Sequence, residues 1–235
     1  KKRLTQGPSV STYLPTTTGA RYALPIEYNT SGEAIGLLVE PAATNIILRS
    51  REFTDAAWAM SGGLTVAADI TTSPNGLVDA HELIPDAAPG SQYMGQTVPS
   101  TTGVLSFTCK ANEFDKILIL GNAGRGFDLT NGTTSGVTGI AVADDYGIDD
   151  LGDGWYRCWM YDASAYTSAR LYVLDSFSAT SVTGSGTNSV FVSDAQFETG
   201  SVATSPIVTK GSTATRDKDQ LHMSVFDFPF ARPGP

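Results

Sequence analysis

Short segments rich in β-forming residues recur along the chain, separated by turn-forming residues. The clearest spans residues 104–111, in which Leu105, Phe107 and Cys109 alternate with polar residues. Successive side chains of a strand point to opposite faces, so this alternation predicts a strand with one buried and one polar face. No helix of useful length is evident. Many short strands joined by turns predict an all-β fold built as an antiparallel β-sandwich.

The turn residues set the expected organisation of the chain. A hairpin is expected where β-prone runs at 21–27 and 34–40 flank the turn Asn29–Gly32. We therefore expect an N-terminal arm and hairpin at 1–40, a sandwich domain at 41–208 and, at 209–235, an irregular tail or the start of a following segment. Further strands are expected at 44–48, 64–68, 78–84, 93–98, 104–111, 116–120, 126–129, 139–143, 155–161, 169–174 and 189–197.

Composition excludes several classes of function. The net charge of −9 and the isoelectric point near 4.6 argue against a broad basic surface for nucleic acid. No apolar run approaches the ~20 residues that cross a bilayer as a helix. The two cysteines, Cys109 and Cys158, fall on expected inward faces. We expect buried free thiols there, although a disulfide is the alternative.

An aromatic strand at 155–161 follows the glycine turn at 153–154 and is the most informative segment for function. By alternation, Tyr156, Cys158 and Met160 form a plausible core face. The opposite face carries Trp155, Arg157, Trp159 and Tyr161. Flat rings stack on the apolar face of a sugar, and a guanidinium reaches its hydroxyl groups. The alternative is that Trp155 or Trp159 simply fills the core.

Arg170 and Tyr172 share one face of a later expected strand. If that face adjoins the Trp155 face, the two together make a saccharide-binding patch of several rings and two arginines. Each stacking or hydrogen-bonding contact would supply about 1 kcal/mol. A single site of this kind is weak, so strength would come from several copies acting together.

Catalytic signals are weak. Neither His81 nor His222 lies in a nucleophile motif, and no Gly-x-Ser-x-Gly elbow is present. The acidic cluster, which comprises Asp144, Asp145, Asp149, Asp150 and Asp153, lies in a glycine-containing connection. A solvated turn is the first interpretation, a calcium loop the second, and paired catalytic carboxylates the third. We therefore expect that the chain is not an enzyme.

Several motifs resemble a domain found in bacteriophage tail and structural proteins. They cover about residues 28–217, in the same order as in that family, and are Gly36–Asn45 followed by Phe53 and Trp58, Ser73–Gly76, Gly154–Cys158, Ala195–Gly200, Ala203–Ile207 and Thr215–Arg216. That domain is in turn similar to jelly-roll carbohydrate-binding modules of the galactose-binding-like type. The resemblance implies two antiparallel sheets and a concave face or loop rim for a glycan. It also implies a structural calcium, for which Glu52 and Asp194 are the nearest matching ligands.

From the resemblance and the aromatic strand we expect a non-catalytic glycan-binding domain of a phage or phage-like particle. Its partners would be bacterial surface polysaccharide, other virion proteins and further copies of itself, as in a trimeric fibre. Its location would be the virion, acting at the bacterial surface. The alternative is a purely structural module of a tail fibre or spike, favoured by the Thr/Ser/Pro-rich N-terminal arm and the apolar C-terminal tail. A polysaccharide depolymerase is a third and weaker hypothesis.

Overall fold

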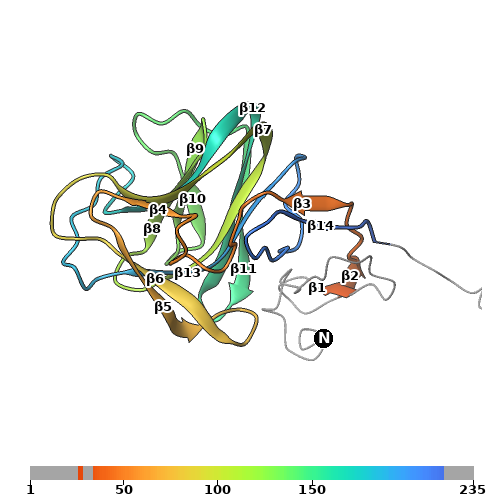
Figure 1. Cartoon of the computed structure of the whole chain (residues 1–235), viewed down its shortest axis with the longest axis horizontal. Coiled ribbons are helices and arrows are strands. Elements are labelled where there is room, and N and C mark those ends of the chain that lie inside the picture. The colour runs from red at the N-terminus through yellow and green to blue at the C-terminus, as the bar shows by residue number, and fades with distance from the viewer. Residues whose placement is uncertain (1–25, 29–33, 220–235) are drawn as a thin grey trace, which may run out of the picture.

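Two long antiparallel strands, β7 (Gln92–Ala111) and β12 (Trp155–Leu174), organise the protein (Figure 1). The computed structural model describes residues 26–28 and 34–219, and these residues form strands and loops without a helix. The 12 strands from β3 to β14 belong to one hydrogen-bonded antiparallel network. The predicted all-β class is confirmed.

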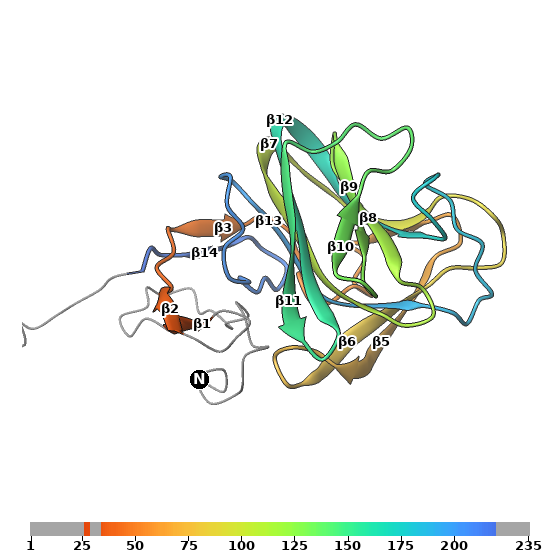
Figure 2. The same cartoon turned by 180° about the vertical axis from the view of Figure 1, so that it is seen from behind.

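The network folds into two layers because β7 and β12 change direction near their middles. Their pairing register shifts twice, between Asp162 and Tyr166 and between Tyr166 and Ser168. Such bulges bend a strand and increase its twist. One half of each strand therefore serves one layer and the other half serves the second, as the two views in Figures 1 and 2 indicate.

The first layer contains the N-terminal half of β7 and the C-terminal half of β12. Its order is β4, β7, β12, β8, β9 and β10. The bounds of the added strands are β4 (Ala59–Ser61), β8 (Lys116–Leu120), β9 (Gly124–Asp128) and β10 (Thr133–Ser135).

The second layer contains the other halves of β7 and β12. It continues from β11 through β12 and β7 to β13, which also pairs with β6 and β3. Its added strands are β3 (Ala43–Asn45), β5 (Thr65–Thr72), β6 (Val78–Ile84), β11 (Asp145–Gly152), β13 (Val190–Glu198) and β14 (Ala214–Arg216). A separate hairpin joins β1 (Ile26–Tyr28) to β2 (Ala34–Leu37).

One hydrophobic core lies between the two layers. The first layer contributes Met94, Val98, Ile117, Ile119, Leu171 and Val173, and the second contributes Leu83, Leu105, Phe107, Cys158, Met160, Val192 and Phe197. The loop residues Phe53 and Trp58 fill the same core, with ring centroids 5.2 Å apart. This shared core is what makes the sheet a sandwich. Cys109 and Cys158 are buried free thiols, as predicted.

Several local predictions are wrong. Residues 93–98 and 104–111 are parts of one strand, and so are 155–161 and 169–174. Residues 139–143 form no strand and make one isolated bridge at Val142. The acidic cluster lies mostly in β11, paired with β12, so its interpretation as a connecting turn is corrected. The true connection is Asp153–Gly154, both with positive φ.

Some predicted features lie outside the described residues: the arm at 1–20, the hairpin turn at 29–32, His222 and the end of the tail at 220–235. Within the part assigned by sequence to the tail, residues 209–219 pack on the sandwich. Strand β14 pairs with β3, and the side chain of Arg216 is fully buried.

Candidate ligand-binding groove

The face of β12 predicted to bind a sugar is largely covered. Trp155 is only 2% exposed and packs with Ala80 and Leu151 beside the partly buried Phe191. Its indole Nε1 donates to the backbone oxygen of Thr72 at 3.1 Å. The β5–β6 hairpin and β11 thus enclose this ring. Trp155 packs inside the domain, which is the alternative to sugar binding stated above.

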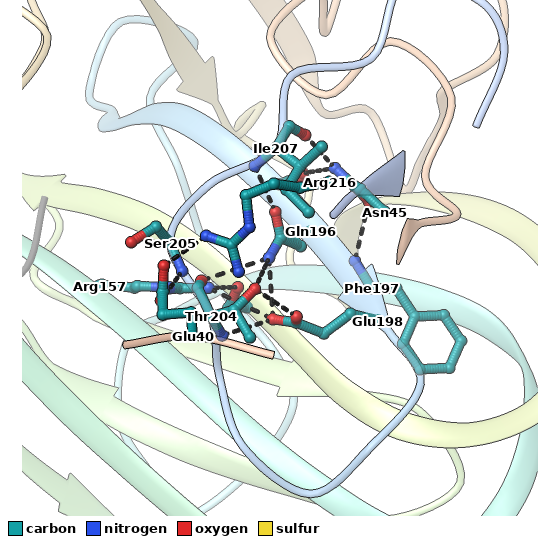
Figure 3. Close-up of polar contacts among 12 residues, drawn as sticks. Glu40, Asn45, Arg157, Gln196, Phe197, Glu198, Thr204, Ser205, Ile207 and Arg216 are labelled. Carbon is teal, nitrogen blue, oxygen red and sulfur yellow. Dashed lines mark hydrogen bonds and ion pairs between the residues drawn. The ribbon is translucent and has the colours of Figure 1, made fainter. Parts of the chain in front are cut away.

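Arg157 is also buried, in a polar network on the outer side of the second layer (Figure 3). Its Nη2 donates to Ser106 Oγ at 3.1 Å and lies 3.7 Å from Glu198 Oε1. Gln196 Nε2 donates to the same carboxylate at 2.8 Å, and Thr204 Oγ1 donates to Glu198 Oε2 at 2.6 Å. The arginine predicted to contact sugar hydroxyls is therefore committed to internal partners.

The segment 199–219 completes that network and covers the sheet face. Glu40 accepts a hydrogen bond from the backbone nitrogen of Ser205 at 2.6 Å and another from the guanidinium of Arg216. The Glu40 backbone nitrogen donates to Asp219 Oδ2 at 2.9 Å. Figure 3 shows Glu40, Ser205 and Arg216 close to one another beside Gln196 of β13. Trp155 and Arg157, which were predicted to bind an external ligand, instead contact the chain itself.

Trp159 and Tyr161 remain partly accessible at the β11 side of the second layer. The Trp159 ring lies against Gly147, where an added Cβ would stand 2.5 Å from Trp159 Cζ2. Burial raises the pKa of Asp149, while Arg157 and a hydrogen bond with Trp159 oppose that rise. The indole is therefore packed on one face and anchored at its polar edge.

Arg170 and Tyr172 lie in the other layer, away from Trp155. The shifts in register change the alternation along β12, so the predicted single patch does not form. Tyr172 is buried and stacks on Tyr93 of β7, with ring centroids 4.5 Å apart and planes inclined by 29°. These two rings sit opposite each other on paired strands. The prediction of one multi-ring face is wrong, but a smaller aromatic pair exists here.

An open groove of about 450 Å³ lies beside this pair. It runs over β4, β7 and β12, on the face opposite the shared core. Its lining comprises Leu48, Ala57, Ala59, Tyr93, Gly95, Gln96, Thr97, Ser168 and Arg170. It combines an aromatic ring, hydroxyl groups, a guanidinium and small apolar side chains, and such a mixture is typical of small-ligand sites.

Hydrogen bonds fix one wall of the groove. Gln96 Oε1 accepts from the backbone nitrogen of Leu48 at 2.6 Å, and Gln96 Nε2 donates to the Leu48 oxygen at 2.9 Å. This pair of bonds holds the segment after β3 against β7. At the opposite side, Ala59 of β4 pairs with Gly95. The groove is thus formed by backbone held in place on both sides.

Gly95 shapes the floor of the groove. A Cβ at this position would lie 2.8 Å from Arg170 Cγ and 3.2 Å from the Ala169 backbone oxygen. A glycine inside a strand commonly marks such a close approach. The absence of a side chain lets the Arg170 stem cross β7, which places its guanidinium Cζ 5.9 Å from the centre of the Tyr93 ring.

Of the predicted residues, only Arg170 lines the groove, with Tyr172 behind Tyr93. Tyr93, Gln96 and Ser168 also line the groove and were not predicted from the sequence. One signal could have found Tyr93: in Tyr93-Met94-Gly95-Gln96 the residue sits on the same strand face as a mid-strand glycine. No comparable signal places Leu48 or Ala57 nearby, because both come from irregular segments.

The two predicted calcium ligands have arginine partners. Glu52 Oε2 lies 2.7 Å from Arg49 Nη1, and Asp194 Oδ1 lies 2.5 Å from Arg51 Nε. In residues 26–28 and 34–219, no three His, Cys, Asp or Glu side chains gather closely enough to hold a metal. The residues present do not fit a calcium ion at this position, and the predicted calcium has no described ligand set.

His81 and the two cysteines, whose pKa values are shifted by burial, lie away from the groove. His81 is buried beside the edge of Phe53, and burial lowers its pKa against the opposing effect of nearby carboxylates. Burial raises the pKa of the Cys109 and Cys158 thiols, so both stay protonated and poorly nucleophilic. None of these three groups lines the groove.

Comparison with protein-family models and with curated proteins finds no match to this chain. The described residues include no helix long and apolar enough to cross a membrane.

Proposed function

We propose that this protein is a non-catalytic glycan-binding domain and that its ligand lies in the groove over β4, β7 and β12. The observation that carries the proposal is the Tyr93–Tyr172 stack beside Arg170 at an open groove. One ring face can receive the apolar side of a sugar, while the guanidinium, Thr97 and Ser168 offer hydrogen bonds. The volume of about 450 Å³ suits one or two sugar rings.

The wider setting of the proposal comes from the motif resemblance. We propose that the domain belongs to a phage or phage-like particle and attaches it to bacterial surface polysaccharide. The jelly-roll topology, the assembly into trimers and the contacts with other virion proteins are parts of the same proposal. A weak single groove gains strength when several copies act together.

A glycan array with the purified protein, followed by calorimetry on the hits, tests this function. Tyr93→Ala should weaken binding at least tenfold, because the stacking surface is lost. Trp159→Ala is the matched control, since it removes a partly exposed ring in the other layer. Loss of binding with Trp159→Ala alone would move the site to the β11–β12 face. If the protein bound none of the neutral and acidic host polysaccharides, the proposed function would be overturned.

A structural virion module is the second candidate, and one observation favours it. Residues on both flanks of the sandwich are joined by buried polar contacts, including the Glu40–Arg216 ion pair and the Glu40–Asp219 hydrogen bond. Such anchoring suits a module that must hold its shape in an assembly. Sedimentation equilibrium of the full chain tests this candidate: a stable oligomer supports it, and a monomer at all concentrations contradicts it.

A further inference from the structure

Among the residues that the structure describes, Arg170 is the single charged residue that lines the groove. It stands among neutral side chains in a chain whose net charge is −9. The groove therefore carries a local positive charge on a molecule that otherwise repels anions.

The guanidinium of Arg170 has few internal partners. Its Nη1 donates to Tyr172 Oη at 3.3 Å, and its Nη2 reaches the Gly121 oxygen at 3.5 Å, the outer limit for such a bond. Its Nε is buried and has no hydrogen-bond partner. Because Nε is buried, a ligand would engage the two Nη atoms, each of which carries a second N–H besides the one in its internal hydrogen bond.

Apart from Arg125, the other arginines of the described sandwich have carboxylate partners. Among the described residues, Arg49, Arg51, Arg157 and Arg216 each form an ion pair with Asp or Glu. Arg170 forms none in the part of the chain that the structure describes. Its nearest titratable partner, Tyr172, has a pKa raised by burial and so brings no negative charge at neutral pH.

The position of Arg170 is fixed before any ligand arrives. Its stem crosses Gly95, and its guanidinium is held between the Tyr172 hydroxyl and the Tyr93 ring. A planar fork fixed in this way suits a carboxylate, which accepts two parallel hydrogen bonds from one guanidinium. A neutral hydroxyl would use one of those donors and leave the charge unpaired.

We propose that the groove selects an acidic saccharide, with the sugar carboxylate on Arg170 and the sugar ring on Tyr93. The inference rests on the proposed glycan-binding function and names the class of sugar. Uronic acids and sialic acids share this chemistry, so the probes below include both.

Calorimetry with paired probes tests the inference. The probes are oligosaccharides of galacturonic acid, glucuronic acid and N-acetylneuraminic acid, each as the free acid and as its methyl ester. The ester keeps the ring and removes the charge. At least one free acid should bind the wild-type protein ten times or more tightly than its ester.

Two arginine variants locate the charge. Arg170→Gln should abolish the preference for the acid, and Arg170→Lys should keep part of it because the charge stays while the fork is lost. Arg125→Gln is the matched control. Arg125 also has no carboxylate partner among the described residues, but it lies over the Tyr146 ring, 3.8 Å from its centre, and does not line the groove.

The outcomes separate the two proposals. Equal binding of acid and ester that still depends on Tyr93 would overturn the acidic class and leave glycan binding intact. No binding of any probe, acid or neutral, would overturn both. An acid preference that Arg125→Gln removes as fully as Arg170→Gln would reflect overall charge and would overturn the assignment to the groove. The acid–ester comparison uses the wild-type protein, so it stands even if a variant fails to fold.

Discussion

At the scale of single residues, the same side-chain type has different surroundings in the two layers. Arg157 and Arg170 lie on one strand, and both face away from the core. Arg157 meets Glu198 under a covering segment, whereas Arg170 lines an open groove and meets no described carboxylate. The two arginines thus differ in their partners and in whether a segment covers them, and neither difference is encoded next to the arginine in the sequence.

Arg216→Leu should destabilise the protein by about 3–5 kcal/mol, because it leaves the buried Glu40 carboxylate without its cation. Urea unfolding measures the change. Glu52→Gln is the control at the more exposed Arg49–Glu52 pair, where the expected loss is below about 1 kcal/mol. Similar losses for both variants would contradict the distinction between buried and surface pairs.

Because His81 is buried, we expect the folded protein to lose stability at mildly acidic pH. Burial lowers its pKa in the folded state, so below the ordinary value near 6.5 the unfolded state binds the extra proton. Stability from this group is present at pH 7 and is lost as the pH falls, by at most about 1.4 kcal/mol per unit. Urea unfolding at pH 7.0 and 5.5 should give a smaller difference for His81→Gln than for the wild type, with His222→Gln as control. If His81→Gln loses as much stability between pH 7.0 and 5.5 as the wild type does, the pH dependence does not come from His81.

At the scale of elements, the sequence predicts strands well where alternation is uninterrupted. β6 and β8 have the predicted bounds, and 104–111 has the predicted inward face. The pattern fails where a bulge adds a residue, because the inward face then switches from even to odd positions. On β12 the core residues are Cys158 and Met160 before the bulges and Leu171 after them.

The candidate site is less predictable than the fold for a related reason. Arg170 and Tyr93 meet across paired strands 77 positions apart, and the cover over Arg157 comes from residues 199–219. Such contacts depend on tertiary pairing, which local periodicity does not contain. The Asp153–Gly154 turn, by contrast, is a local signal that the sequence does contain. Asp-Gly favours a two-residue hairpin turn, so it could have indicated that a strand, β11, precedes the aromatic strand.

Gly154→Ala should destabilise the β11–β12 hairpin by about 1–2 kcal/mol. Gly154 has a φ of 77°, and an added Cβ would approach Lys110 Cε no closer than 3.5 Å, so the cost is conformational rather than steric. Gly136→Ala is the control, since that glycine has no positive φ and nothing lies within 4 Å of the place that an added Cβ would take. Thermal unfolding compares the two; equal midpoints would contradict the assigned turn.

At the scale of the whole molecule, the sandwich is closed by its sequence-distant ends. β3 and β14 pair antiparallel, and the Glu40–Arg216 and Glu40–Asp219 contacts lie next to that pair. The described domain therefore begins and finishes at the same place on the second layer, where β3 and β14 lie side by side in both views (Figures 1 and 2). The groove lies in the other layer, so the closure of the sandwich and the proposed ligand site occupy different parts of the molecule.

A disulfide across β3 and β14 should stabilise the whole domain. Thr44 and Thr215 are direct cross-strand partners, and their hydroxyl oxygens are 2.7 Å apart. Thr44→Cys combined with Thr215→Cys should oxidise readily and raise stability by about 2–4 kcal/mol, because the bond closes a loop spanning 171 positions of the unfolded chain. Urea unfolding with and without reductant measures the gain, and each single variant is the control. The native thiols Cys109 and Cys158 are buried and should not compete. Failure of the double variant to oxidise, or a gain that persists under reductant, would contradict the pairing that closes the sandwich.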